Sequence, residues 1–160
     1  MQHVGITLLL IIVANGAPIL IRFVLGERLK FPVDCHYIFI DGNRLFGDSK
    51  TWVGLISIPI FSVSAAWLIG ESVVTGTLIG AGVMAGDLCS SFIKRRLGIK
   101  ESSMALGIDQ IPESLFPSLL MRKSMNFDVL DIVIIVVSFI ILELLVSRFL
   151  YWLHIRKQPY

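Results

Sequence analysis

The sequence predicts an all-α polytopic membrane protein with five transmembrane helices. Hydrophobic residues make up 55% of the 160 residues and charged residues only 16%, whereas a soluble domain carries about 25% charged residues. The apolar residues also gather in runs long enough to cross a hydrocarbon core of about 30 Å. Because this length suits one small bundle, we expect residues 1–160 to form a single integral membrane domain.

The first predicted span covers residues 4–25, where only Asn15, Pro18 and Arg22 interrupt the apolar run. At 1.5 Å per residue this helix reaches about 33 Å, which is enough to cross the bilayer. Pro18 follows the one plausible small-residue cleavage point, so we expect a retained span rather than a signal peptide. Further apolar runs predict spans at residues 53–69, 72–93 and 128–150.

The remaining span, residues 108–122, is short and contains Asp109, Pro112, Glu113 and Pro117. It predicts either a short, kinked crossing inside the bundle or a re-entrant segment, because irregular backbone at membrane depth must be buried in protein or line a cavity. On a five-span topology, Glu113 is expected nearer the external side, away from the cytoplasmic loops.

Basic residues predict the orientation in the cell membrane. Eleven fall on one face, which holds the loops 26–52 and 94–107 and the C-terminal end, and only Arg122 and Lys123 fall on the other. Lysine and arginine concentrate in cytoplasmic loops, so we expect the N-terminus outside and these loops in the cytoplasm. The eleven are Arg28, Lys30, Arg44, Lys50, Lys94, Arg95, Arg96, Lys100, Arg148, Arg156 and Lys157.

The cytoplasmic segment 41–54 is unlike an ordinary membrane loop. It places Asp41, Arg44, Asp48 and Lys50 within ten residues, together with three glycines. Lysine and arginine beside free backbone amides suit a polyphosphate. A turn-rich loop anchored at the interface by Trp52 is the plainer alternative.

The end of the predicted span 72–93 carries a second polar group. Its members share one helix face through i, i+3, i+4 and i+7 spacing: Asp87, Ser90, Ser91 and Lys94. A carboxylate in an apolar run is costly and needs a partner, either Lys94 or Arg95 in a salt bridge or a hard cation such as Mg²⁺. Asp109 could approach the same point. We therefore expect the cytoplasmic loops to form an active site of the metal–phosphate type.

Other intramembrane features leave alternatives open. Two G-x-x-x-G pairs in the span 72–93 predict close helix packing, within the bundle or in a homodimer. Arg22 and Glu143 lie at a similar depth, so they either pair with each other or Arg22 meets a lipid headgroup. The basic clusters accompany spans and lack interleaved aromatic residues, so no nucleic-acid partner is expected.

The two cytoplasmic segments resemble the CTP-dependent lipid cytidylyltransferases, most closely the archaeal branch, the CDP-archaeol synthases. Residues 41–52 are similar to that branch's first cytoplasmic loop, and the wider pattern F-G…K-T-W-E-G is matched with Val53 in place of the glutamate. The signature S-x-x-x-K-R-x-x-x-x-K-D is matched by Ser90, Lys94, Arg95 and Lys100, with Glu101 at its last position. Asp109-Gln110 stands where bacterial phosphatidate enzymes have Asp-Arg.

This resemblance implies transfer of the cytidylyl group of CTP to an isoprenoid ether lipid phosphate, 2,3-bis-O-(geranylgeranyl)-sn-glycerol 1-phosphate. It implies that Asp87 and Asp109 hold Mg²⁺ and that these two residues act in catalysis with Lys94. The residues that it implies for binding CTP or the lipid phosphate are Asp41, Asn43, Arg44, Asp48, Lys50, Thr51, Ser90, Ser91, Arg95 and Lys100.

Three other functions compete with this interpretation. A bacterial-type phosphatidate cytidylyltransferase would use a diacyl lipid, and a CTP-dependent polyprenol kinase would release CDP. A small divalent-cation transporter, with Asp87, Glu143 and Arg22 along its pathway, belongs to a different class. Only the transporter would move ions without using a nucleotide.

Overall fold

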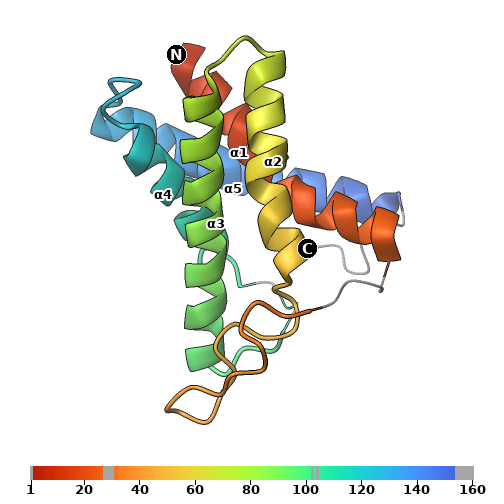
Figure 1. Ribbon diagram of the computed structural model, residues 1–160. Helices are drawn as coiled ribbons and strands as arrows, with labels where there is room; N and C mark the ends of the chain where they lie inside the picture. The colour runs from red at the N-terminus through yellow and green to blue at the C-terminus, as the bar shows by residue number, and fades with distance from the viewer. Residues whose placement is uncertain (1, 27–30, 102, 104, 154–160) are drawn as a thin grey trace.

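The computed structural model describes residues 2–26, 31–101, 103 and 105–153. Four of the basic residues used to predict the orientation, Arg28, Lys30, Arg156 and Lys157, lie outside this described part. Within it the chain has five helices and no strand, which confirms the all-α prediction (Figure 1). The helices are α1 (Gln2–Leu25), α2 (Trp52–Leu68), α3 (Val73–Arg96), α4 (Gln110–Met121) and α5 (Val129–Trp152).

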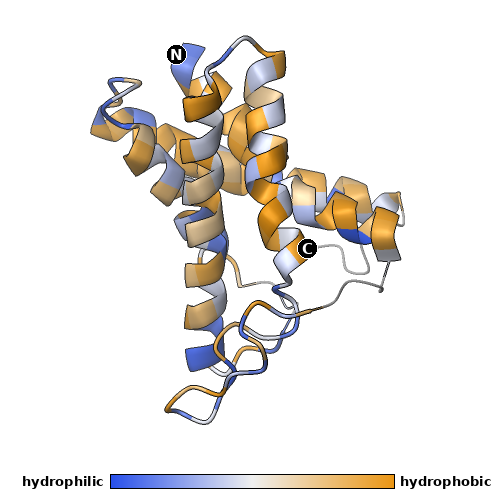
Figure 2. Ribbon diagram, viewed as in Figure 1, coloured by the Kyte–Doolittle hydropathy of each residue, from blue (hydrophilic) through white to orange (hydrophobic). Residues whose placement is uncertain are grey.

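Three helices, α1, α3 and α5, are long and apolar enough to cross a membrane, with 24 residues each. The shorter α2 has 17 apolar-rich residues. With 12 residues, α4 is only about 18 Å long, which is less than the hydrocarbon core, as the sequence predicted for this segment. Figure 2 shows mostly apolar residues along the helices, whereas the loops at one end of α3 contain both polar and apolar residues.

Local hydrogen bonds explain where three of the helices begin. The side-chain oxygens of Thr51 and Ser72 accept hydrogen bonds from the first-turn amides of α2 and α3. At α5, Asp128 and Asp131 form a reciprocal capping box. Such caps satisfy amides that have no partner within the helix and typically contribute about 1 kcal/mol each.

Helix α3 packs between α2 and α4 through glycines that face both neighbours. A Cβ on Gly76 would lie 2.7 Å from the Cα of Val63 in α2, and one on Gly82 would lie 2.5 Å from the Cα of Pro117 in α4. Gly76 and Gly80 therefore allow α2 to approach α3 closely, whereas Gly82 and Gly86 allow the approach of α4. This arrangement confirms the prediction of close helix packing within the bundle.

Two loops lie at the same end of α3, whereas the turn between α2 and α3 lies at the opposite end (Figure 1). The first loop comprises residues 31–51, and the second comprises residues 97–109 without 102 and 104. Arg96, at the end of α3, attaches the first loop to the helix. Its guanidinium lies 4.7 Å from the ring centroid of Phe39 and 4.4 Å from that of Phe92, and it forms an ion pair of 2.6 Å with Asp41.

Candidate functional site

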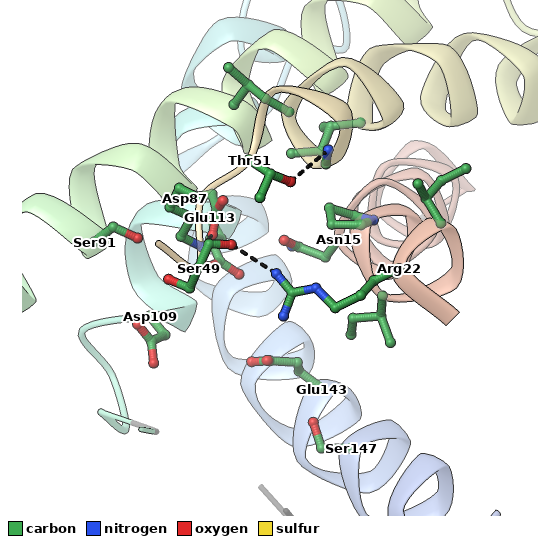
Figure 3. Close-up of a pocket in the computed structure, with 18 of the residues that line it drawn as sticks. Asn15, Arg22, Ser49, Thr51, Asp87, Ser91, Asp109, Glu113, Glu143 and Ser147 are labelled. Atoms are coloured by element: carbon green, nitrogen blue, oxygen red, sulfur yellow. Dashed lines mark hydrogen bonds and ion pairs between the residues drawn. The ribbon is translucent and has the colours of Figure 1, made fainter. Parts of the chain in front are cut away.

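A cavity of about 760 Å³ opens where both loops meet the helices (Figure 3). All five helices and both loops contribute to its walls. Its polar and charged lining residues are Asn15, Arg22, Ser49, Lys50, Thr51, Asp87, Ser91, Lys94, Arg95, Ser103, Asp109, Gln110, Glu113, Glu143 and Ser147. Such a density of charge in a largely apolar bundle marks this cavity as the candidate site.

The first loop is folded around the buried carboxylate of Asp34. Arg44 donates to both of its oxygens, at 2.6 and 3.2 Å, and the amides of Phe46 and Gly47 donate at 3.0 and 2.9 Å. Burial alone would raise the pKa of Asp34, but the hydrogen bonds from Arg44 and the loop amides outweigh it and hold that pKa well below its ordinary value. The loop therefore has an ionised centre that fixes the backbone leading to Lys50.

Glu101 joins the second loop to the first. Its carboxylate accepts a hydrogen bond of 2.9 Å from the amide of Asp48 and lies 3.7 Å from the guanidinium of Arg95. Gly47 has a φ of +94°, and a Cβ there would lie 2.3 Å from the Glu101 carboxylate. The positive φ favours glycine at this position, and an added Cβ would push the Glu101 carboxylate away from the Asp48 amide and Arg95.

Lys50 reaches from the first loop to α3, where it forms an ion pair with Asp87. Burial favours the neutral amine, but the attraction of Asp87, Glu113 and Asp109 is stronger and raises the pKa of Lys50 above its ordinary value. The lysine is therefore a permanent cation at neutral pH. The sequence left a salt bridge from Asp87 to Lys94 or Arg95 open as one alternative. In the structure Asp87 pairs with Lys50 from the first loop, while Lys94 pairs with Asp109 and Arg95 with Glu101.

Lys94 forms a second ion pair, with Asp109. Its ammonium lies 3.0 Å from one carboxylate oxygen and 3.1 Å from the other, and it donates to the Ser103 carbonyl at 2.6 Å. The amide of Ala105 donates to the same carboxylate at 3.0 Å. Asp109 is thus oriented immediately before α4 begins, so its position in the cavity depends on the packing of α4 against α3.

The opposite wall of the cavity comes from α1 and α5 and contains most of its apolar residues. Arg22 extends from the last turn of α1 and donates to the Ser49 carbonyl at 2.9 Å (Figure 3). Glu143 and Ser147 enter from α5. The cavity therefore has a highly charged wall on the loops, α3 and α4 and a more apolar wall on α1 and α5.

The structure brings together seven of the predicted site residues in this cavity. They are Lys50, Thr51, Asp87, Ser91, Lys94, Arg95 and Asp109. Thr51 also has a structural role, because its side-chain oxygen caps α2.

The other six predicted residues do not line the cavity. Four belong to the framework of the first loop, where Arg44 binds Asp34 and Asp48, and Asn43 bonds to Asp41. Ser90 is buried and donates to the Asp87 carbonyl at 3.0 Å. The sixth residue, Lys100, is exposed.

Two carboxylates were placed wrongly or missed by sequence reasoning. Glu113 was expected near the external side, but it lines the cavity, because α4 begins at Gln110 and places Glu113 within about one turn of Asp109. Asp34 was not singled out, although it organises the first loop. Its only signal was a lone acidic residue among apolar ones shortly before a glycine-rich segment.

Chemically, the cavity combines lysine and arginine groups with carboxylates beside an apolar wall. The cations suit phosphate groups, and the carboxylates suit a hard metal ion that is also bound by phosphate oxygens. The apolar wall suits a lipid chain. This combination fits a reaction between a water-soluble phosphate compound and a membrane lipid.

The sequence is similar to those of known proteins. The CarS-like family of CDP-archaeol synthases matches residues 6–160. A CDP-archaeol synthase of Sulfurisphaera tokodaii is 30% identical over 135 residues, covering 81% of both chains. One of Saccharolobus islandicus is 39% identical over 116 residues, covering 68% of this chain and 65% of its own.

A solved structure is also similar to this fold. It is described as an intramembrane enzyme for archaeal membrane lipids biosynthesis, and it superposes with a TM-score of 0.70 at 28% sequence identity. The match covers 89% of this chain and 90% of the solved one. Together with the matching family over nearly the whole length, these similarities show that the chain belongs to the CDP-archaeol synthase family.

Proposed function

We propose that this chain is an integral membrane enzyme that transfers the cytidylyl group of CTP to 2,3-bis-O-(geranylgeranyl)-sn-glycerol 1-phosphate. The products are unsaturated CDP-archaeol and pyrophosphate. The observation that carries this proposal is a cavity in which a charged wall faces an apolar one. Membership of the CDP-archaeol synthase family favours this reaction over those of a bacterial-type enzyme, a polyprenol kinase or an ion transporter.

The charged wall suits the triphosphate of CTP. Lys50 and Lys94 are held there by Asp87 and Asp109, and Arg95 lines the cavity beside them. The Nε of Arg95 is buried and has no hydrogen-bond partner among the described residues. A buried donor of this kind is costly unless it is satisfied by a ligand or water, so we assign Arg95 to the triphosphate.

The donor set fits Mg²⁺ as the metal. Magnesium is usually held by one or two carboxylates together with substrate phosphates, and Asp87 and Asp109 supply two carboxylates to one cavity. No group of three or more metal-ligating side chains occurs within the described ranges, so the nucleotide would complete the coordination. Bound there, Mg²⁺ would offset the negative charge on the phosphate oxygens during the transfer.

The reaction needs positioning more than proton transfer. An oxygen of the lipid phosphate forms a bond to the α-phosphorus of CTP, and the bond from that phosphorus to the β-phosphate bridging oxygen breaks. The second pKa of a phosphate monoester is about 6, so the attacking oxygen is already ionised at neutral pH. Lys50, Lys94 and Arg95 then have the task of holding the phosphates in line and stabilising the charge that leaves with pyrophosphate.

We further propose that the loop end of the molecule faces the cytoplasm, because the excess of basic residues lies there and CTP is a cytoplasmic nucleotide. The N-terminus would then lie outside the cell. We do not propose a homodimer. The sequence suggested one through the G-x-x-x-G pairs of α3, but α2 and α4 of the same chain pack against those glycines.

Purified protein in detergent, supplied with CTP and Mg²⁺, tests this function. Three parallel samples contain digeranylgeranylglyceryl phosphate, diacyl phosphatidic acid or no lipid, and pyrophosphate and the CDP-lipid are measured. Release that requires the isoprenoid lipid and stops with EDTA supports the proposal. Equal use of both lipids would contradict the lipid assignment, and CDP in place of pyrophosphate would contradict cytidylyl transfer.

A further inference from the structure

One face of α1 carries two polar side chains into the cavity. Asn15 and Arg22 both line it, and they lie seven positions apart in one helix. Seven residues correspond to about two turns, so both side chains share a face and lie about 10 Å apart along the axis. Figure 3 shows them reaching into the cavity from α1, while Asp87 and Ser91 reach into it from α3.

Arg22 connects the α1 wall to the loop that carries Lys50. Its Nη2 donates to the carbonyl of Ser49, the residue immediately before Lys50. The guanidinium has five N–H donors, and the hydrogen bond to Ser49 uses one of them. Because the residue is exposed, an anion that enters beside α1 can reach a planar donor group suited to two phosphate oxygens.

Asn15 lies deeper along the same face. Its Nδ2 is buried and has no hydrogen-bond partner in the described part of the chain. A buried amide donor in this situation is destabilising unless another group satisfies it. The surrounding lining is apolar and includes Ile12, Ile19 and Phe139, so the position suits the junction between a polar headgroup and its hydrocarbon chains.

We propose that Arg22 and Asn15 form the binding site for the headgroup of the lipid acceptor, which extends the function proposed above. Arg22 contacts the phosphate of the lipid, and Asn15 donates to an ether oxygen of its glycerol. The phosphate is thereby held next to Ser49 and Lys50, whereas the chains follow α1 and α5 toward the membrane. Ser49 contacts Arg22 on the α1 wall, and Lys50 contacts Asp87 on the α3 wall. These adjacent residues therefore bring the lipid phosphate and the CTP phosphates close together.

The experiment compares Arg22→Gln, Arg22→Lys and Asn15→Leu with the wild-type protein. The matched control is Arg148→Gln, since Arg148 is an exposed arginine of α5 that does not line the cavity. We expect Arg22→Gln to raise the KM for the lipid about tenfold or more while the KM for CTP stays within about twofold. Arg22→Lys keeps the charge without the planar donors, so its effect is intermediate.

Direct binding provides a readout that is independent of turnover. Native mass spectrometry in detergent measures retention of digeranylgeranylglyceryl phosphate and of digeranylgeranylglycerol, which lacks the phosphate. We expect wild type and Arg148→Gln to prefer the phosphate form, Arg22→Gln to lose that preference, and Asn15→Leu to bind both forms more weakly. Should Arg22→Gln fail to fold, Asn15→Leu and Arg22→Lys still decide the result.

Two results would overturn the inference. One is an unchanged preference for the phosphate form in the Arg22 variants, and the other is a rise in the KM for CTP as large as that for the lipid. A wild-type protein that binds the lipid phosphate through Arg22 but releases no pyrophosphate would support the headgroup site while contradicting the proposed reaction. The two proposals therefore fail separately.

Discussion

Lys50 and Asp87, which are 37 positions apart in the sequence, form an ion pair that joins the first loop to α3. The pair brings one cation and one carboxylate of the candidate site into contact. Lys50 lines the cavity from the end of the first loop. The site therefore forms only when that loop is correctly folded.

Replacing Asp87 by Asn should reduce pyrophosphate release by at least about 100-fold. The change removes the carboxylate charge that both the metal assignment and the Lys50 ion pair require, while it keeps the size of the side chain. Initial rates at saturating CTP and lipid measure the effect, and thermal unfolding checks that the bundle is intact. Asp131→Asn makes the same chemical change at the start of α5, outside the cavity, and should keep full turnover. Wild-type activity in Asp87→Asn would contradict the metal assignment.

Gly47→Ala should impair the site more than Gly42→Ala. Both glycines have a positive φ, +94° and +80°, so both variants carry the cost of about 1 kcal/mol for placing alanine in that conformation. Only at Gly47 would the new Cβ meet Glu101, whereas nothing lies within 4 Å at Gly42. We expect the KM for CTP to rise severalfold in Gly47→Ala and to stay near the wild-type value in Gly42→Ala. Equal effects would show that the contact with Glu101 is unimportant.

Gly86→Ala should disturb the packing of α3 against α4. A Cβ there would lie 2.4 Å from the carbonyl oxygen of Pro112, which is backbone and can give way only if α4 moves. Overpacking of this kind costs about 1–3 kcal/mol. We expect a lower thermal midpoint together with a loss of turnover, since α4 carries Glu113 and follows Asp109. Gly5→Ala in α1, with open space around its Cβ, should show neither effect, and an unchanged Gly86→Ala variant would refute the packing argument.

Asp34→Asn should destabilise the protein at pH 7, and its disadvantage should shrink in acid. The pKa of Asp34 in the fold is lower than its ordinary value of about 3.9. A depressed pKa contributes stability that is fully present above the ordinary value and is lost as the pH falls below it. The difference in thermal midpoint between wild type and variant, followed by tryptophan fluorescence at pH 7 and at about pH 3, measures this. A difference that grows in acid would have the wrong sign for this explanation.

The sequence predicted the helices well because long apolar helices can be recognised from the local composition of the chain. Predicted spans at 53–69 and 72–93 differ by a few residues from α2 and α3. Polar residues in the helix ends, such as Asp87 and Lys94, were also recognised, since a charge in an apolar run stands out against its neighbours. These features depend on the immediate sequence and on helical periodicity.

The parts that sequence reasoning placed wrongly depend on long-range packing. Glu113 was assigned by counting along a presumed full crossing, but a helix of 12 residues that starts beside Asp109 keeps it near the loops. The family pattern included Lys100, yet that residue is exposed and does not line the cavity. The ion pairs around Asp34 and Glu101 decide which loop residues reach the cavity. These ion pairs join residues that have no regular spacing in the sequence.

The contacts of Arg96 with the rings of Phe39 and Phe92 have a consequence for how a substrate is captured. An arginine remains charged at every physiological pH, and its contacts with the rings and with Asp41 involve protein groups alone. The first loop is thus fastened before any nucleotide arrives, so little conformational entropy is lost when one binds. We therefore expect nucleotide association to proceed in a single kinetic step, without a slow phase for loop ordering.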